Sequence, residues 1–90
     1  MTDPRQTTIK RLNMRSMRRG IKEMDLILPA FASAHLDGMD QAGLDLYEAL
    51  LAENDHDLYQ WVTGQDAAPE PYGGLIALIA QGAYGIVRPA

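Results

Sequence analysis

The segment from Gly20 to Ala34 reads GIKEMDLILPAFASA and carries the clearest apolar periodicity in this chain of 90 residues. Its large apolar residues recur at intervals of three and four: Ile21, Met24, Leu28 and Phe31. That spacing places them on one face of an α-helix. The segment therefore predicts a helix from about Ile21 to Ala34 that packs this face against a core. Pro29 should bend the helix, because it removes a backbone hydrogen bond near Asp25.

A second helix is predicted before this segment, from about Thr8 to Arg18. Thr7 or Thr8 would be its N-cap, since a hydroxyl can accept a hydrogen bond from a free backbone N–H. Gly20 would take the left-handed position that often follows the end of a helix. Residues 1–7 are expected to be flexible.

Further helical signals follow towards the C-terminus. Residues 36–39 predict a turn, and Asp40 is a suitable N-cap for a helix to about Glu53. Asp55 would cap a short helix that stops before Gly64, and a last helix would begin near Pro71. Val, Ile and Thr never alternate with polar residues over a useful length, so strands are not expected. The predicted fold is all-α, a compact bundle of about five short helices in a single domain spanning residues 1–90, with residues 86–90 flexible.

The composition is that of one globular domain, with 47% hydrophobic and 22% charged residues. No cysteine is present, which excludes a disulfide framework, a thiolate zinc site and a cysteine nucleophile. The longest apolar run, Leu75–Ala80, has six residues and is too short to cross a bilayer. No apolar secretory segment follows the basic start, so a cytoplasmic location is expected.

The charges are divided along the sequence. Residues 1–22 have a net charge of +6, whereas residues 23–90 have a net charge of −10. Such a division favours oriented association with a charged partner. An Arg-rich, acid-poor start also resembles a mitochondrial presequence, but a folded basic helix is the interpretation that we favour.

Candidate catalytic groups are scarce. No Gly-rich loop lies between a strand and a helix, and the two histidines, His35 and His56, are 21 residues apart. The acidic run from Glu53 to Asp57 lacks the alternating ligands and central glycine of a calcium loop, and helix capping explains it. Met14, Met17 and Met24 are expected to fill gaps in the core. The sequence therefore predicts neither an enzyme nor a metal site.

The densest group of charged residues lies between the first two predicted helices. Arg15, Arg18 and Arg19 would complement the negative end of the first helix, and Glu23 and Asp25 the positive end of the second. Helical geometry places Leu26 away from the core face, next to these charges. An exposed aliphatic side chain surrounded by charge is typical of a docking surface.

Two sequence blocks resemble the SdhE family of flavinylation factors, which includes succinate dehydrogenase assembly factor 2. The first is RSMRRGIKEMDLIL at residues 15–28, which contains the family's Arg-Gly-x-x-Glu motif at Arg19, Gly20 and Glu23. The second comprises Leu50, Leu51 and Glu53, the segment DLYQWV at residues 57–62, and Gly64. The resemblance covers roughly residues 11–80, and the order and spacing of the two blocks make it specific.

The resemblance implies an assembly factor rather than an enzyme. Such a factor binds the flavoprotein subunit of succinate dehydrogenase, or of the similar fumarate reductase, and promotes covalent attachment of FAD to a histidine of that subunit. Arg19 and Glu23 would make charge-assisted contacts with the partner, and Gly20 would allow close approach of the backbone. Four residues would flank them: Arg15, Arg18, Asp25 and Leu26. The absence of spare sequence before the motif favours a bacterial cytoplasmic member.

The resemblance further implies that FAD is attached to the partner and is not bound tightly by this chain, in which we find no phosphate-binding loop. The factor is expected to act as a monomer, without nucleic acid and without stable insertion into a membrane.

Two alternatives remain open at this point. The basic helix from Lys10 to Lys22 could bind nucleic acid, although the acidic remainder and a pI of about 4.9 argue against it. An antitoxin-type regulatory module, or one that docks on membranes, is the second alternative.

Overall fold

The computed structural model describes residues 3–83, and over this range the protein is helical, without strands. Five α-helices and one 3₁₀ turn follow in order: α1 (Pro4–Arg15), α2 (Lys22–His35), η1 (Leu36–Gly38), α3 (Gln41–Leu51), α4 (Asp55–Val62) and α5 (Gly73–Ala83). The predicted all-α bundle is therefore confirmed. The tail predicted to be flexible, residues 86–90, lies outside the described residues.

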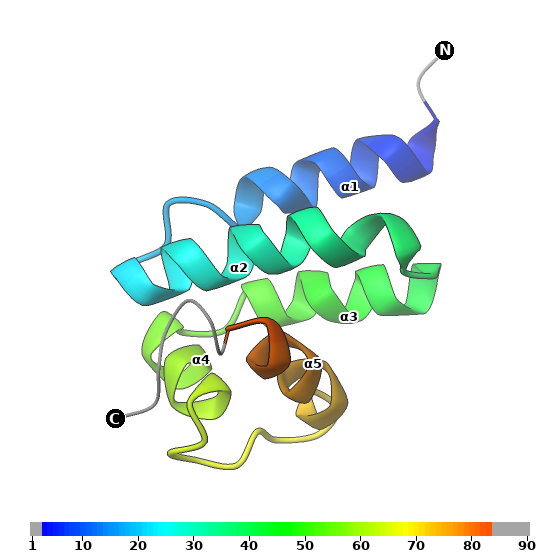
Figure 1. The fold of residues 1–90 in the computed structure, drawn as a ribbon. Coiled ribbons are helices and arrows are strands. Elements are labelled where there is room, and N and C mark those ends of the chain that lie inside the picture. The colour runs from blue at the N-terminus through cyan, green and yellow to red at the C-terminus, as the bar shows by residue number, and fades with distance from the viewer. Residues whose placement is uncertain (1–2, 84–90) are drawn as a thin grey trace.

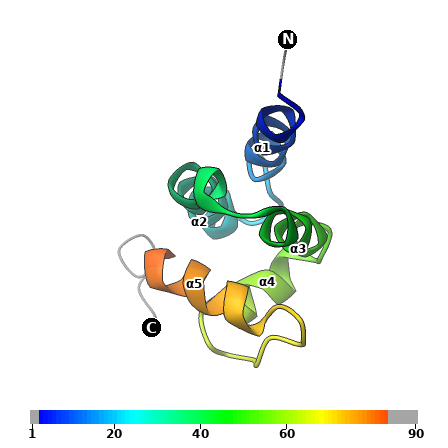
Figure 2. The same ribbon diagram turned by 90° about the vertical axis from the view of Figure 1, so that its right-hand side faces the viewer.

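The first three helices run alternately up and down. α2 runs opposite to both α1 and α3 in Figure 1, and it packs against α1, α4 and α5, while α1 also contacts α3. Figure 2, turned by 90°, shows α4 and α5 together on the side away from α1. This topology brings the connection between α1 and α2 to the same end of the bundle as the end of α3 and the start of α4.

The core is formed largely around α2. Met24, Leu28 and Phe31 are buried as their spacing predicts, and Ile27 widens the buried face. Leu26 is 50% exposed, which agrees with its predicted position away from the core. Side chains from the other helices complete the core, including Leu12, Leu44, Tyr47, Leu50, Leu58 and Ile79.

The helix ends differ from the prediction where a stronger cap lies nearby. α1 begins at Pro4, because the Asp3 carboxylate accepts a hydrogen bond from the backbone N–H of Arg5 at 3.0 Å and proline suits a first helical position. Residues 4–7 are therefore helical rather than flexible. Asp40 caps α3 as predicted. The cap of α4 is Asn54, one residue before the predicted Asp55.

Two further expectations were wrong. α1 ends at Arg15, and the residue with left-handed backbone geometry is Arg18, with φ 56°, rather than Gly20. Met24 is buried, but Met14 and Met17 are 64% and 52% exposed, so they do not fill the core. Among residues 3–83, no helix combines the length and apolar character needed to cross a lipid bilayer.

Candidate functional site

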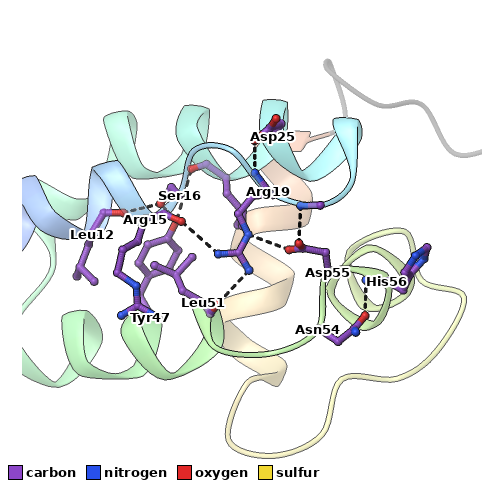
Figure 3. A network of polar contacts seen from close by, with 12 residues as sticks. Leu12, Arg15, Ser16, Arg19, Asp25, Tyr47, Leu51, Asn54, Asp55 and His56 are labelled. Atoms are coloured by element: carbon purple, nitrogen blue, oxygen red, sulfur yellow. Dashed lines mark hydrogen bonds and ion pairs between the residues drawn. The ribbon is translucent and has the colours of Figure 1, made fainter.

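The predicted motif lies in the connection between α1 and α2 and in the first turns of α2. Figure 3 shows this connection against the end of α3 and the start of α4, with Arg19 in the centre of a polar network. We call this network the Arg19 clasp and define it by Arg19, Gly20, Asp25 and Asp55. It joins segments that are up to 36 residues apart in the sequence.

Arg19 uses three side-chain nitrogens inside the molecule. Its Nε donates to Asp55 Oδ1 at 2.8 Å, its Nη1 to the carbonyl of Arg15 at 3.1 Å, and its Nη2 to the carbonyl of Leu51 at 2.9 Å. The two carbonyls lie at the C-terminal ends of α1 and α3, where backbone oxygens lack helical partners and the helix dipole favours a cation. The guanidinium therefore ties the ends of α1 and α3 to the start of α4.

Asp55 binds the motif a second time through Gly20. Its Oδ2 accepts a hydrogen bond from the Gly20 backbone N–H at 2.7 Å. A Cβ atom at position 20 would lie 3.1 Å from the same oxygen, so glycine permits this close approach. Because Asn54 caps α4, the Asp55 carboxylate is available for both contacts.

Asp25 closes the clasp from α2. Its carboxylate accepts a hydrogen bond from the backbone N–H of Arg19. Together, Asp25 and Asp55 hold two successive backbone N–H groups of the connection. This bonding fixes the backbone at Arg19 and Gly20, between the last hydrogen bonds of α1 and the start of α2.

Glu23 and Leu26 differ from these inward-bonded residues. Within residues 3–83, the half-buried Glu23 side chain has no hydrogen-bond or ion-pair partner, and Leu26 is half exposed. Both lie in the first turns of α2, directly after the connection. The surface therefore presents one carboxylate and one aliphatic side chain on a fixed backbone.

Arg15 turns towards α3 instead of joining this surface. Its Nη1 lies 3.3 Å from Glu48 Oε2, and Arg11 Nη1 lies 2.6 Å from the same oxygen. The hydrogen bond from Arg11 lowers the pKa of Glu48. These groups are largely solvent-exposed, so the ion pairs orient α1 on α3 without adding much stability.

A buried hydrogen bond at Ser16 fixes the end of α1, where the connection begins. Ser16 is fully buried, and its Oγ lies 2.6 Å from the hydroxyl oxygen of Tyr47 and 2.8 Å from the carbonyl of Leu12. Burial raises the pKa of Tyr47 to about 12, because the phenolate would lose its hydration. The end of α1 is thereby fixed to α3.

The acidic run that precedes and begins α4 is used for structure. Glu53 accepts a hydrogen bond from the Tyr72 hydroxyl at 3.2 Å, Asn54 caps α4, and Asp55 belongs to the clasp. In the part of the chain that the structure describes, no three His, Asp or Glu side chains gather closely enough to hold a metal ion.

Asp55 is the site residue that sequence reasoning missed. Its position beside Asn54 predicts a helix cap, and no local pattern links it to Arg19. Only the packing of α3 and α4 against the connection brings the two together.

Comparisons with known proteins identify the family. Residues 10–83 match the Sdh5 family, described as "Flavinator of succinate dehydrogenase". Three relatives are each named "Succinate dehydrogenase assembly factor 2, mitochondrial". The relative from Meyerozyma guilliermondii is 44% identical over 77% of this chain and 52% of its own length. The relative from Candida glabrata is 53% identical over 59% of this chain and 35% of its own length. The relative from Aedes aegypti is 38% identical over 78% of this chain and 45% of its own length.

These relatives correct the predicted location. All three are named as mitochondrial, which contradicts the cytoplasmic location expected from the N-terminal sequence. The expectation relied on the lack of an apolar secretory segment and of spare sequence before the motif, and neither observation excludes a mitochondrial location. The folded basic helix that we favoured over a presequence is present as α1. The chain spans about a third to a half of the length of these relatives.

The family match covers the structural elements that build the site. It begins within α1 and ends at the end of α5, so it includes the Arg19 clasp, Glu23 and Leu26. The resemblance of the two sequence blocks and the match over residues 10–83 therefore agree. This chain belongs to the Sdh5 family, the flavinators of succinate dehydrogenase.

Proposed function

We propose that this protein is an assembly factor that binds the flavoprotein subunit of succinate dehydrogenase and promotes covalent attachment of FAD to it. The family and its named relatives support this function. The structural observation that carries it is the clasp, which fixes the connection and leaves Glu23 and Leu26 on the surface after it.

The factor would act by orientation. A bound partner that is held with its histidine and its flavin aligned reacts faster, because the entropy of alignment has already been lost. The nucleophile belongs to the partner, so this chain needs no catalytic residue. FAD would contact this chain weakly or not at all, and the factor would act as a monomer. The similar flavoprotein of fumarate reductase is a second partner of the same class.

The motif residues would have two roles, one in shaping the surface and one in contacting the partner. Arg19, Gly20 and Asp25 make their polar contacts within the molecule, so we propose that they shape the surface. Glu23 would make the charged contact with the partner, and Leu26 would supply apolar area beside it. An unpaired carboxylate on a fixed helix is well placed to accept charge-assisted hydrogen bonds.

Binding to nucleic acid is not favoured, because many of the basic residues are already engaged. Arg11 and Arg15 pair with Glu48, and Arg19 belongs to the clasp. Arg5 donates to the backbone carbonyls of Asp37 and Met39. Few N-terminal cations remain to contact phosphates.

The test is co-expression with the flavoprotein subunit in cells that lack their own factor. Covalent FAD is measured as flavin fluorescence that stays on the flavoprotein band after denaturing electrophoresis. We expect a signal that requires this protein, that falls with Glu23→Ala and that persists with Glu70→Ala, a change at an exposed glutamate before α5. Equal fluorescence with and without the protein would refute the function.

A further inference from the structure

Two exposed methionines, Met14 on α1 and Met17 in the connection after it, have no role in the surface proposed above. Four large hydrophobic side chains are strongly exposed in the described chain, and the two most exposed are Met14 at 64% and Met17 at 52%. Apolar side chains that the fold leaves in water contribute little to its stability. Two of them close together therefore call for another explanation.

Lys10 and Met14 share one face of α1, and Met17 follows Met14 in the turn after the helix. Met14 and Lys10 are each two residues from the buried Leu12, which puts them about 160° around the axis from it. The Met17 backbone N–H donates to the Met14 carbonyl at 3.1 Å, so the turn continues and the two methionines are neighbours. We use the name outer face of α1 for Lys10 and Met14 on the helix together with Met17 and Arg18 in the connection directly after it, all of which are exposed.

The charge of this face is positive. Among the described residues, Lys10 and Arg18 have no ion-pair partner, whereas Arg11 and Arg15 on the flank near α3 are paired with Glu48. The outer face therefore combines two thioether side chains with two available cations. Its chemistry is complementary to an acidic surface with an apolar centre.

The backbone at Arg18 is a second, independent observation. Its φ of 56° is uncommon for a residue with a side chain and costs about 1 kcal/mol or more. Glycine or asparagine would adopt this geometry more easily. An arginine held there, with its side chain exposed, is consistent with a role for the side chain outside the fold.

We propose that the outer face of α1 is a second contact surface for the flavoprotein subunit and that it binds an acidic patch with an apolar centre. The inference rests on the function proposed above. A protein is favoured over an anionic membrane or a nucleic acid, because the whole chain carries a net charge of −4 and the face offers no aromatic side chain for stacking or insertion.

Methionine suits this surface because of its flexibility. An unbranched thioether adapts to contacts of different shape. A contact of this kind can fit an acidic patch with an apolar centre without a preformed pocket.

The experiment measures binding of the purified chain to the flavoprotein subunit before FAD attachment. We expect Met14→Gln with Met17→Gln to raise the Kd by roughly tenfold, since apolar contacts in a desolvated centre carry much of the binding energy. We expect Lys10→Gln with Arg18→Gln to weaken binding at low salt and to flatten its dependence on salt. The thermal midpoint should change by less than about 4 °C, because these side chains are exposed.

The control is Ala42→Glu with Gln81→Glu, which changes the net charge by the same amount at exposed sites on α3 and α5. Wild-type affinity in this control and weaker binding in both test variants would support the proposal. Wild-type affinity in the methionine variant would overturn it and leave the proposed function intact. No binding by the wild-type chain would overturn both. Binding of the face to anionic vesicles or DNA in place of the flavoprotein would also overturn it.

Discussion

Arg19 and Asp55 form an ion pair across 36 positions of sequence, with Arg19 Nε and Asp55 Oδ1 2.8 Å apart and both side chains less than one-fifth exposed. The other carboxylate oxygen of Asp55 binds the neighbouring Gly20 N–H. One residue of α4 thus holds two residues of the motif. The pair is a structural part of the surface that we assign to partner binding.

Replacing Asp55 should weaken both stability and flavinylation. Asp55→Asn replaces one carboxylate oxygen by an NH₂ group, which cannot accept a hydrogen bond. Either Arg19 Nε or the Gly20 N–H would then lose its acceptor, which should cost about 1–3 kcal/mol of unfolding free energy. Urea unfolding measures this loss. Asp57→Asn is the matched control, because Asp57 also lies in the first turn of α4 and is exposed. Equal losses in the two variants would mean that the clasp adds nothing beyond the helix dipole.

A methyl group at position 20 should disturb the clasp slightly. The new Cβ of Gly20→Ala would lie 3.1 Å from Asp55 Oδ2, so the carboxylate must move by a few tenths of an ångström. We expect a loss of up to about 1 kcal/mol, well below that of a buried cavity. Gly38→Ala, where nothing lies within 4 Å of the added carbon, is the control. Greater harm at position 38 than at position 20 would contradict this account.

Alanine substitutions at Leu26 and Leu28 should show which effect belongs to partner binding and which to folding stability. Leu26→Ala should cost less than about 1 kcal/mol because half of the side chain is already in water, yet it should reduce flavinylation. Leu28→Ala should cost about 2–5 kcal/mol because it leaves a cavity in the core. Denaturation midpoints and covalent flavin are measured on the same preparations. Full flavinylation by Leu26→Ala would remove Leu26 from the proposed contact.

Stability should fall at alkaline pH because of Tyr47. Its pKa is raised to about 12 in the folded state, whereas an unfolded tyrosine loses its proton near pH 10. The contribution of the protonated Tyr47 hydroxyl to the free energy of unfolding is therefore fully present below pH 10. It is lost as the pH rises towards 12, by up to about 3 kcal/mol. Unfolding by denaturant between pH 8 and pH 11 measures the slope. Tyr47→Phe should be less stable at pH 8 but should show a shallower decline, and an unchanged slope would exclude Tyr47 as the cause.

Local patterns predicted the helices well. The spacing from Ile21 to Phe31 identified α2 and most of its buried face, because helical periodicity depends on residues that are close in sequence. Asp40 was correctly predicted as a cap for the same reason. The start of α1 was wrong because Asp3 and Pro4 together cap a helix better than Thr7 or Thr8 does.

The site was predicted only in part. The motif falls at the connection between two helices as the sequence predicted, and the position of Leu26 on the surface followed from helical geometry. The inward bonding of Arg19 did not follow, because its partners lie on α3 and α4 and no short-range rule relates them. The exposure of Met14 and Met17 was missed for a related reason. Methionine is common in cores, and only the final packing of α1 shows which face is buried.

The clasp makes the motif dependent on the completed fold. Arg19 needs the end of α3 and the start of α4 before its hydrogen bonds can form. During synthesis, the motif emerges from the ribosome well before Asp55 does. A nascent or truncated chain that lacks Asp55 can therefore contain all residues of the motif without its folded conformation. Competence to engage the flavoprotein would then arise late, as a property of a finished molecule.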